Sequence, residues 1–487
     1  MRSFSRSSRW KVLVNSLISR RDLLFGVGLG LFSVLVIDYL VYLIPLVILM
    51  FLLKSFGEKY LLSLSIFLLL SFGSDIGESL REIMNLFSMA IIIYLIFSRE
   101  LNIFEKLKKL PGSFVFLIFF VLGSMFVSSA FSSLPAIAFQ AVGRQIIFFT
   151  LILLIFLLYN KREDFEMLFN TIVISGVAVS TFIIYSFFSS SSDLQQLLID
   201  SYVKQGGLFK NIAAAGGLLM ITIGATLVVI TSRSSFSENS RRFVWLFLFI
   251  QIIAFLLTNS RAAFMGLSLA GGLMFFSYRR KLFYRTATVG LLLIPFIIFL
   301  FPEIVHIFSN FLRLERVLEN TRYYLWDIMF RMINDNPVLG VGPMITKYNL
   351  DRYINVLWGS WDAEQLIYNF EKGGLGQAHN FYIFRWTELG IPGLFSSVLL
   401  PGIFVFYSLR ILKHLRGSGN ADDRLYSGIL FIGAGVFLRG VFEATGILSH
   451  GWISRDLPFW LLFITVLHKF TEIHASQNRE TKTESEK

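Results

Sequence analysis

The sequence predicts an all-α, polytopic integral membrane protein with about 12–14 transmembrane helices and a long, partly helical outer loop. Of the 487 residues, 55% are hydrophobic and 53 are Phe, a composition too apolar for a soluble core of this size. Runs such as 151–159 and 243–257 carry no charge, as expected of helices that cross the hydrocarbon layer. The apolar segments do not alternate at period two, which argues against a transmembrane barrel.

The predicted helices correspond to a series of apolar segments along the chain. Several are shorter than the roughly 20 residues that a full span needs, so two neighbours can join into one broken helix. The segments lie at about 23–37, 39–53, 61–73, 83–97, 114–130, 145–159, 165–188, 212–231, 243–258, 262–277, 286–301, 379–411, 426–441 and 457–468.

The basic residues predict the orientation of these helices. The net charge of +12 would suggest nucleic-acid binding in a soluble protein, but in a membrane protein it sets topology, and we expect no nucleic-acid partner. With the N-terminus inside, most of the 44 Lys and Arg fall in inner loops, as the positive-inside rule requires. Both termini are therefore expected in the cytoplasm, and 302–378 outside.

This outer segment divides the chain. Tyr323, Trp326, Phe330 and Ile333 recur at three and four residues before Asn336-Pro337, which predicts a helix that ends at the proline. The segment is long enough for two or three helices, and long structured loops often carry function. We therefore predict four regions: transmembrane helices in 1–301, a cap in 302–378, further transmembrane helices in 379–470 and a polar tail in 471–487.

Three arginines occur singly at predicted outer ends of spans, where the orientation rule disfavours them: Arg81, Arg144 and Arg261. Each can snorkel to head groups or pair with a carboxylate, as Arg81 can with Glu78 or Glu82. Arg261 has no carboxylate close to it in sequence. A functional role is therefore favoured most for Arg261.

The neighbours of Arg261 fit an anion-binding role. Asn259 and Ser260 are small and polar, so a diphosphate could approach the backbone while the guanidinium binds it bidentately. Lys210 has the same character, because it follows Gly206-Gly207 and precedes a span. We therefore include Arg81, Arg144, Arg261 and Lys210 as candidate donor-binding residues.

His379 and Asn380 lie where the outer segment meets an apolar one. A lone histidine is more often a structural hydrogen-bonding residue, but this one is expected in the same compartment as Arg261. Imidazole accepts a proton near neutral pH, as a general base must. His379 is therefore the candidate catalytic residue.

Glu388 is unsuited to act with His379. If 379–389 is helical, Glu388 lies on the opposite face and about 13 Å deeper. A membrane-buried ion pair with Arg385, three residues away, is the favoured interpretation. The following Gly390-Ile391-Pro392-Gly393 predicts a break that leaves 379–389 as a short half-helix.

Other enzyme signatures are absent from the sequence. There is no Cys, which excludes disulfides and cysteine nucleophiles. No zinc-protease motif, clustered metal ligands, phosphate-binding loop with Lys-Ser/Thr or serine elbow occurs. The sequence therefore predicts no metal and no cofactor.

Three motifs in order resemble the O-antigen ligase and O-antigen polymerase superfamily. The first is Leu257-Thr258-Asn259-Ser260-Arg261, and the second is Arg322-Tyr323-Tyr324-Leu325-Trp326 leading to Gly340-Val341-Gly342. The third is His379-Asn380 with Glu388-Leu389-Gly390-Ile391-Pro392-Gly393. The resemblance covers about 205–400.

The resemblance implies a metal-independent membrane glycosyltransferase of the bacterial inner membrane, active at its periplasmic face. Its partners would be a glycan on undecaprenyl diphosphate as donor, lipid A-core or another glycan as acceptor, and membrane lipid. Arg261 matches the family's diphosphate-binding Arg, His379 its essential His, and Arg322 part of its cap. Asn259, Ser260, Asn380 and Glu388 are supporting residues of the same motifs.

Two alternatives to ligation stay open. A polymerase that joins lipid-linked repeat units would use the same residues. A flippase or transporter would bind lipid phosphate without chemistry, but it should show inverted repeats and helices broken near the membrane centre, and the sequence shows no internal repeat.

Overall fold

The computed structural model describes residues 57–72, 108, 110–189, 206–209, 211–232, 238–300, 321–353, 378–415 and 421–485. Within these ranges the regular structure is helical and there is no strand, which confirms the predicted all-α class. The predicted spans at 23–37, 39–53 and 83–97 lie outside the described residues, so the total number of spans stays a prediction.

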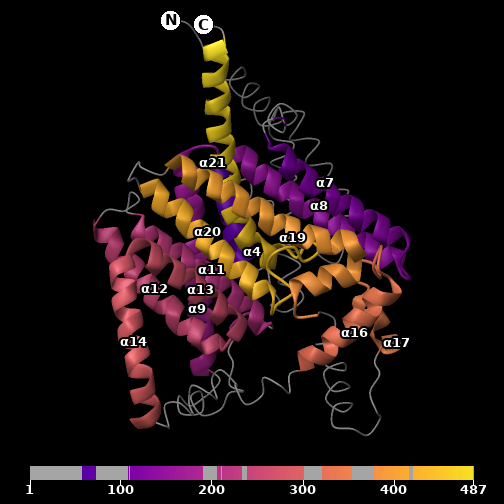
Figure 1. Cartoon of the computed structure of the whole chain (residues 1–487), viewed down its shortest axis with the longest axis horizontal. Helices are drawn as coiled ribbons and strands as arrows, with labels where there is room; N and C mark the ends of the chain where they lie inside the picture. Colours follow the sequence, from indigo (N-terminus) through magenta and orange to yellow (C-terminus); the bar gives the residue numbers. More distant parts are fainter. Residues whose placement is uncertain are drawn as a thin grey trace, which may run out of the picture.

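The helices pack side by side, and the last one extends as a tail beyond the others (Figure 1). Their bounds are α4 Glu58–Phe72, α7 Gly112–Ala130, α8 Pro135–Leu158, α9 Arg162–Ser189, α11 Ile212–Thr231, α12 Glu238–Thr258, α13 Arg261–Tyr278, α14 Arg280–Leu300, α16 Thr321–Asp335, α17 Thr346–Tyr353, α19 Phe381–Leu415, α20 Ala421–Gly440 and α21 Ile453–Ser485.

Six of the described helices are long and apolar enough to cross a membrane: α7, α8, α9, α11, α14 and α19. The shorter stretch Arg242–Thr258 of α12 is also apolar. On α14 the large side chains Leu291, Phe296 and Phe299 are exposed, as expected where a helix faces lipid. The chain is therefore a multi-pass membrane protein.

Small residues allow the central helices to approach closely. A side chain at Gly266 of α13 would meet the backbone oxygen of Gly435 of α20 at 2.7 Å, and one at Gly224 of α11 would meet Ile432 of α20 at 2.7 Å. Such contacts are the usual means of helix packing in membranes, where there is no hydrophobic drive between helices. They hold α11, α13 and α20 together as the centre of the bundle.

The cap contains α16 and α17 among its described residues. As predicted, α16 ends just before Asn336-Pro337. Its buried face, however, is formed by Leu325, Met329 and Met332, whereas Tyr323 and Phe330 of the aromatic stripe are exposed. The buried face is the one that packs against α19, so tertiary packing rather than aromatic content decides which side is covered.

α19 is broken at Gly390, where φ is 64°, as the glycines and proline predict. Val341 N–H and Gly342 N–H donate to Thr387 O and Glu388 O, both at 3.0 Å. These bonds satisfy carbonyl groups that the break removes from the helical ladder. A side chain at Gly390 would clash with Val338 O at 2.3 Å, so the cap is fitted directly against the break.

A buried loop at 441–452 joins α20 and α21. The carboxylate of Asp456, itself fully buried, accepts hydrogen bonds from Gly446 N–H, Ser449 N–H and Ser449 Oγ–H. Asp456 thus supplies the partners that buried non-helical backbone would otherwise take from water. This loop could not be predicted from the sequence, because a short connector between two spans carries no periodic pattern.

Several connections meet this loop at one end of the bundle. Glu443 of this loop lies 3.5 Å from His379, and a side chain at Gly451 of the loop would contact the backbone of Arg144. A side chain at Gly342 of the cap would contact Ser132, which follows α7. We call this end, with 131–134, 258–261, 378–380 and 441–452, the loop end. The opposite end, toward which the tail of α21 extends, is the tail end (Figure 1).

Candidate functional site

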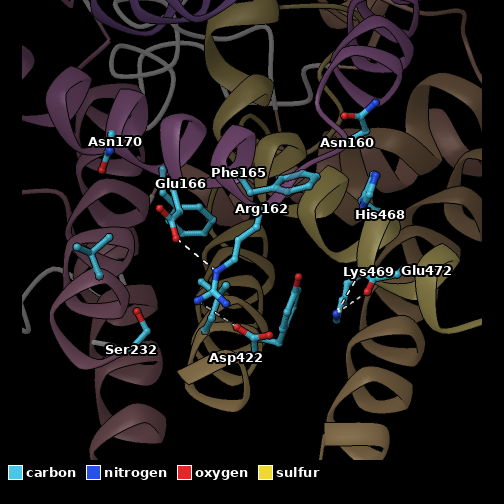
Figure 2. A pocket seen from close by; sticks show the side chains of 14 residues that line it. Asn160, Arg162, Phe165, Glu166, Asn170, Ser232, Asp422, His468, Lys469 and Glu472 are labelled. Atoms are coloured by element: carbon cyan, nitrogen blue, oxygen red, sulfur yellow. Dashed lines mark hydrogen bonds and ion pairs between the residues drawn. The ribbon is translucent and has the colours of Figure 1, made fainter. Parts of the chain in front are cut away.

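The tail end holds a cavity of about 520 Å³ between α9, α11, α20 and α21 (Figure 2). None of the residues predicted for function lines it. Arg162 lies 3.4 Å from Glu166 and 3.7 Å from Asp422, and Lys469 lies 3.1 Å from Glu472. With three carboxylates against two paired cations, this cavity does not attract a phosphate, so we place the candidate site at the loop end.

His379 stands just before α19, with φ at 46°. Its side chain is 31% exposed, and Nδ1 lies 3.5 Å from Oε2 of Glu443 in the buried loop, whose side chain is 5% exposed. Arg322 of α16 reaches the other oxygen of the same carboxylate at 3.4 Å. Glu443 therefore joins the cap to the candidate base, and sequence reasoning missed it.

The charge of Glu443 is set by competing effects. Burial raises the pKa of its carboxyl, but His379, Arg439 and Arg322 outweigh burial and hold the pKa below its ordinary value. Glu443 is therefore ionised at neutral pH. An ionised carboxylate beside an imidazole favours a proton on the nitrogen that faces it, so Nε2 of His379 keeps the lone pair.

Asn380 is a helix cap. Its Oδ1 accepts hydrogen bonds from Tyr382 N–H at 2.9 Å and Ile383 N–H at 3.0 Å. These are the free donors of the first turn of α19, which a preceding Asn commonly satisfies. Asn380 thus starts the half-helix at the residue after His379 and fixes the backbone from which the histidine projects.

Arg261 is the first residue of α13, and Ser260 occupies the capping position before it. Asn259 has a positive φ of 46° and turns the chain between α12 and α13. The N-terminal end of a helix carries partial positive charge and suits an anion. Ser260 also lies against α11, since a side chain at Gly216 would come within 2.5 Å of its Cβ.

Arg439 connects this region to the candidate base. A side chain at Gly217, next to Gly216, would come within 2.5 Å of Arg439 Cζ. Arg439 also interacts electrostatically with Glu443. The structure therefore brings the segment of Arg261 and the segment of His379 to the same end of the bundle, on two sides of Arg439 and Glu443.

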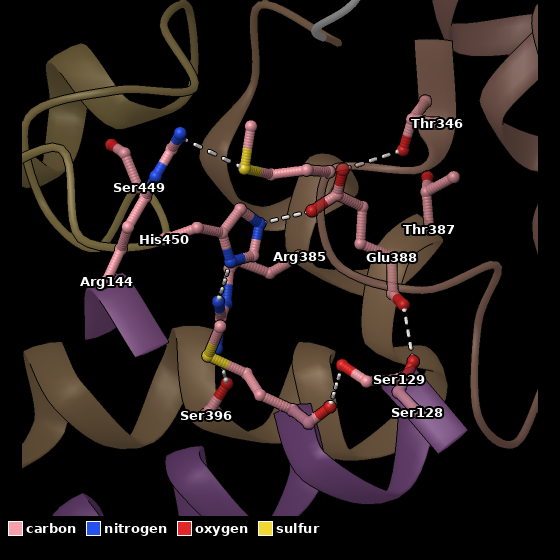
Figure 3. Close-up of polar contacts among 12 residues, drawn as sticks. Ser128, Ser129, Arg144, Thr346, Arg385, Thr387, Glu388, Ser396, Ser449 and His450 are labelled. Carbon is pink, nitrogen blue, oxygen red and sulfur yellow. Dashed lines mark hydrogen bonds and ion pairs between the residues drawn. The ribbon is translucent and has the colours of Figure 1, made fainter. Parts of the chain in front are cut away.

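A second histidine cluster, formed by residues of α19 and the buried loop, is fully buried (Figure 3). Arg385 Nη1 donates to His450 Nδ1 at 3.3 Å, and His450 Nε2 pairs with the carboxylate of Glu388. Glu388 also accepts from Thr346 Oγ–H at 3.0 Å, and Arg385 Nη2 donates to Ser396 Oγ at 3.4 Å.

This arrangement corrects the predicted ion pair between Arg385 and Glu388. Both residues face the same direction from α19, as their spacing predicts, but His450 of the buried loop lies between them. Arg385 can only donate, so the imidazole proton is assigned to Nε2, which faces Glu388. Both nitrogens of His450 are therefore used inside the protein, and Glu388 contacts this cluster rather than His379.

Residues 246–398 match the family model described as O-antigen ligase. This match supports the resemblance to the O-antigen ligase superfamily over residues 246–398 of the 487-residue chain. The matched segment of the ligase domain contains Arg261, Arg322 and His379, whereas Glu443 and His450 lie beyond it. No curated protein matches the chain in a sequence search.

The structure supports a donor-binding role less for the other residues predicted to bind the donor, Arg144, Arg81 and Lys210. Arg144 lies inside α8, which begins at Pro135 rather than near residue 145. Its Nη1 is 3.7 Å from the sulfur of Met344 in the cap, so Arg144 contacts the cap next to the His450 cluster (Figure 3). Arg81 and Lys210 lie outside the described residues.

Metal binding is not indicated by the described part of the chain. Across these residues, no group of three or more His, Asp and Glu side chains is placed to hold an ion. Metal independence of the reaction stays a prediction.

Proposed function

We propose that this O-antigen ligase family enzyme transfers a glycan from undecaprenyl diphosphate to a sugar of lipid A-core. In this proposal the chain lies in the bacterial inner membrane with both termini in the cytoplasm and the loop end in the periplasm. One observation carries the proposal: partly exposed His379, held against the ionised carboxylate of Glu443, lies at the same end of the bundle as Arg261.

The chemistry is a direct displacement. The acceptor hydroxyl attacks the anomeric carbon, the bond from that carbon to the diphosphate oxygen breaks, and the bonding electrons leave with the diphosphate. Nε2 of His379 takes the hydroxyl proton, and Glu443 stabilises the imidazolium that forms. Inversion at the anomeric carbon follows from a single displacement.

The leaving group needs positive charge rather than a protonated acid. Arg261 and the N-terminal end of α13 supply that charge to the departing diphosphate. Replacement of Arg261 by Ala should therefore weaken binding of the lipid-linked donor about tenfold or more. Equilibrium binding of a prenyl diphosphate measures this, and an unchanged affinity would remove Arg261 from the donor site.

The decisive experiment compares surface glycolipid from cells with and without this protein, together with extracted lipid-linked intermediates. We expect bare core on the surface and long glycan chains retained on the lipid carrier, with normal ladders restored by the wild-type protein but not by His379→Ala. Core that bears a single repeat unit would indicate polymerisation instead. Restoration by His379→Ala would contradict a catalytic His379 and favour transport.

A further inference from the structure

Arg439, near the end of α20, has one N–H group that makes no hydrogen bond within the described residues. The residue is 3% exposed. Its Nη1 donates to Thr445 O at 2.7 Å and its Nη2 to Ala213 O at 3.0 Å. Among the described residues, its Nε–H finds no hydrogen-bond partner. A buried charged donor in this state is costly, which points to a ligand atom at this position.

A narrow crevice lies beside Arg439. It is formed by α11, α20, the start of α21 and the buried loop, and its lining includes Gly217, Thr445, Gly446 and Arg455. Its volume is about 10 Å³, which is room for about one water-sized atom. The crevice therefore fits a single oxygen of a larger group that remains outside it.

Cationic side chains line the crevice, and none of its described lining residues carries a carboxylate. Arg439 and Arg455 both line it, and the guanidinium of Arg455 lies 4.0 Å from the ring centre of Trp452. The carboxylates that interact with Arg439 are Glu443 and Asp456. Glu443 also faces Arg322 and His379, and Asp456 is bonded to the buried loop. The chemistry of the crevice therefore favours an anionic oxygen.

A second cationic segment approaches the same turn of α11. Gly216 lies against Ser260, the residue before Arg261, and the next residue, Gly217, lies against Arg439. A side chain at Gly216 would come within 2.5 Å of Ser260 Cβ, and one at Gly217 within 2.5 Å of Arg439 Cζ. An anion with two charged centres, such as a diphosphate, suits two cationic segments that lie against neighbouring residues of α11.

We propose that Arg439 and Arg455 bind one phosphate of a prenyl diphosphate, with one of its oxygens in the crevice at Arg439 Nε, while Arg261 binds the other. This inference rests on the proposed function and adds residues that lie beyond the segment matched to the ligase family. A purely structural role accounts for the two backbone contacts of Arg439 but not for its third donor.

The test compares farnesyl diphosphate with farnesyl monophosphate, each bound to the full-length protein in lipid nanodiscs. Wild type should prefer the diphosphate. Arg439→Lys and Arg455→Gln should each weaken diphosphate binding about tenfold and leave monophosphate binding unchanged. Arg331→Gln is the matched control, because this exposed arginine of α16 pairs with Asp327 on its own helix.

Each other outcome is informative. If wild type prefers the diphosphate and both variants keep that preference, the Arg439 subsite is wrong and the proposed function stands. If Arg439→Lys does not fold, Arg455→Gln decides alone. Inorganic pyrophosphate that binds as tightly as farnesyl diphosphate would overturn the lipid assignment. A wild-type protein that binds no prenyl diphosphate would overturn the proposed function itself.

Discussion

His379, just before α19, and His450, in the buried loop, each face a buried glutamate. The side chain of His379 is 31% exposed against Glu443 at 5%, whereas that of His450 is 3% exposed against Glu388 at 1%. A histidine–glutamate pair thus occurs twice. A substrate can reach the His379 pair, but none can reach the His450 pair.

The surroundings of the two imidazoles decide what each can do. His450 contacts Arg385 through one nitrogen and Glu388 through the other, so it has no nitrogen left for a substrate. His379 faces Glu443 through Nδ1 alone. The difference indicates that His379 is the base and that His450 fastens the buried loop to the half-helix of α19.

Replacement of His379 is the strongest test of the different roles assigned to the two histidines. His379→Ala should lower glycan transfer by about 10²–10⁴-fold or more, because the acceptor hydroxyl loses its base, while the protein remains folded in the membrane. Transfer rates per folded molecule in reconstituted membranes measure this. His414→Ala, at the tail end, is the matched control. Normal turnover in His379→Ala would exclude its role as base.

Removal of His450 should lower the stability of the protein and change its transfer rate little, the opposite of what we expect for His379. His450→Ala leaves the buried charges of Arg385 and Glu388 without the group between them, which should cost about 3–5 kcal/mol of stability. We expect a lower thermal unfolding midpoint in detergent and a lower yield, with the transfer rate per folded molecule changed much less. A variant that is as stable as wild type but inactive would assign His450 to the chemistry.

Glu443→Gln tests the charge beside the exposed histidine. Because the pKa of Glu443 is held below its ordinary value, its carboxylate stabilises the fold above about pH 4.3 and loses this effect as the pH falls through the lower folded pKa. The variant should unfold below the wild-type temperature at neutral pH, and the difference should shrink as the pH falls through the lowered folded-state pKa of Glu443. A difference that is constant with pH would contradict the assigned ionisation.

The smallest effect is expected from Arg322→Gln. Arg322 is partly exposed and lies 3.4 Å from Glu443, and such pairs contribute about 1 kcal/mol or less. We expect a decrease in transfer of about fivefold or less at low salt and a smaller one at high salt. Steady-state kinetics at two ionic strengths measure it. A loss as large as that of His379→Ala would show that Arg322 binds substrate directly.

Local features were predictable because nearby residues determine them. The end of α16 follows from Asn336-Pro337, and the break in α19 follows from Gly390 and the proline after it. Asn380 and His379 stand at a boundary between polar and apolar sequence. For each, the deciding residues are close together in the chain, so a short window is enough.

The partners of these residues could not be predicted in the same way. Glu443, Arg439 and His450 come from the end of α20 and the loop after it, more than fifty residues beyond His379. Only the packing of α20 and α21 against α19 brings them to the site. Without a periodic pattern or motif, the loop reads as a short connector, and its burial follows from tertiary structure alone.

The break at Gly390 also determines which part of the molecule His379 moves with. The carbonyls of the half-helix are bonded to 341–342, and Ile391 N–H donates to Pro337 O at 3.0 Å. The half-helix is thus fastened to the cap, while a left-handed glycine separates it from the rest of α19. A displacement of the cap would carry the base with it and leave the lipid-facing half of the helix in place.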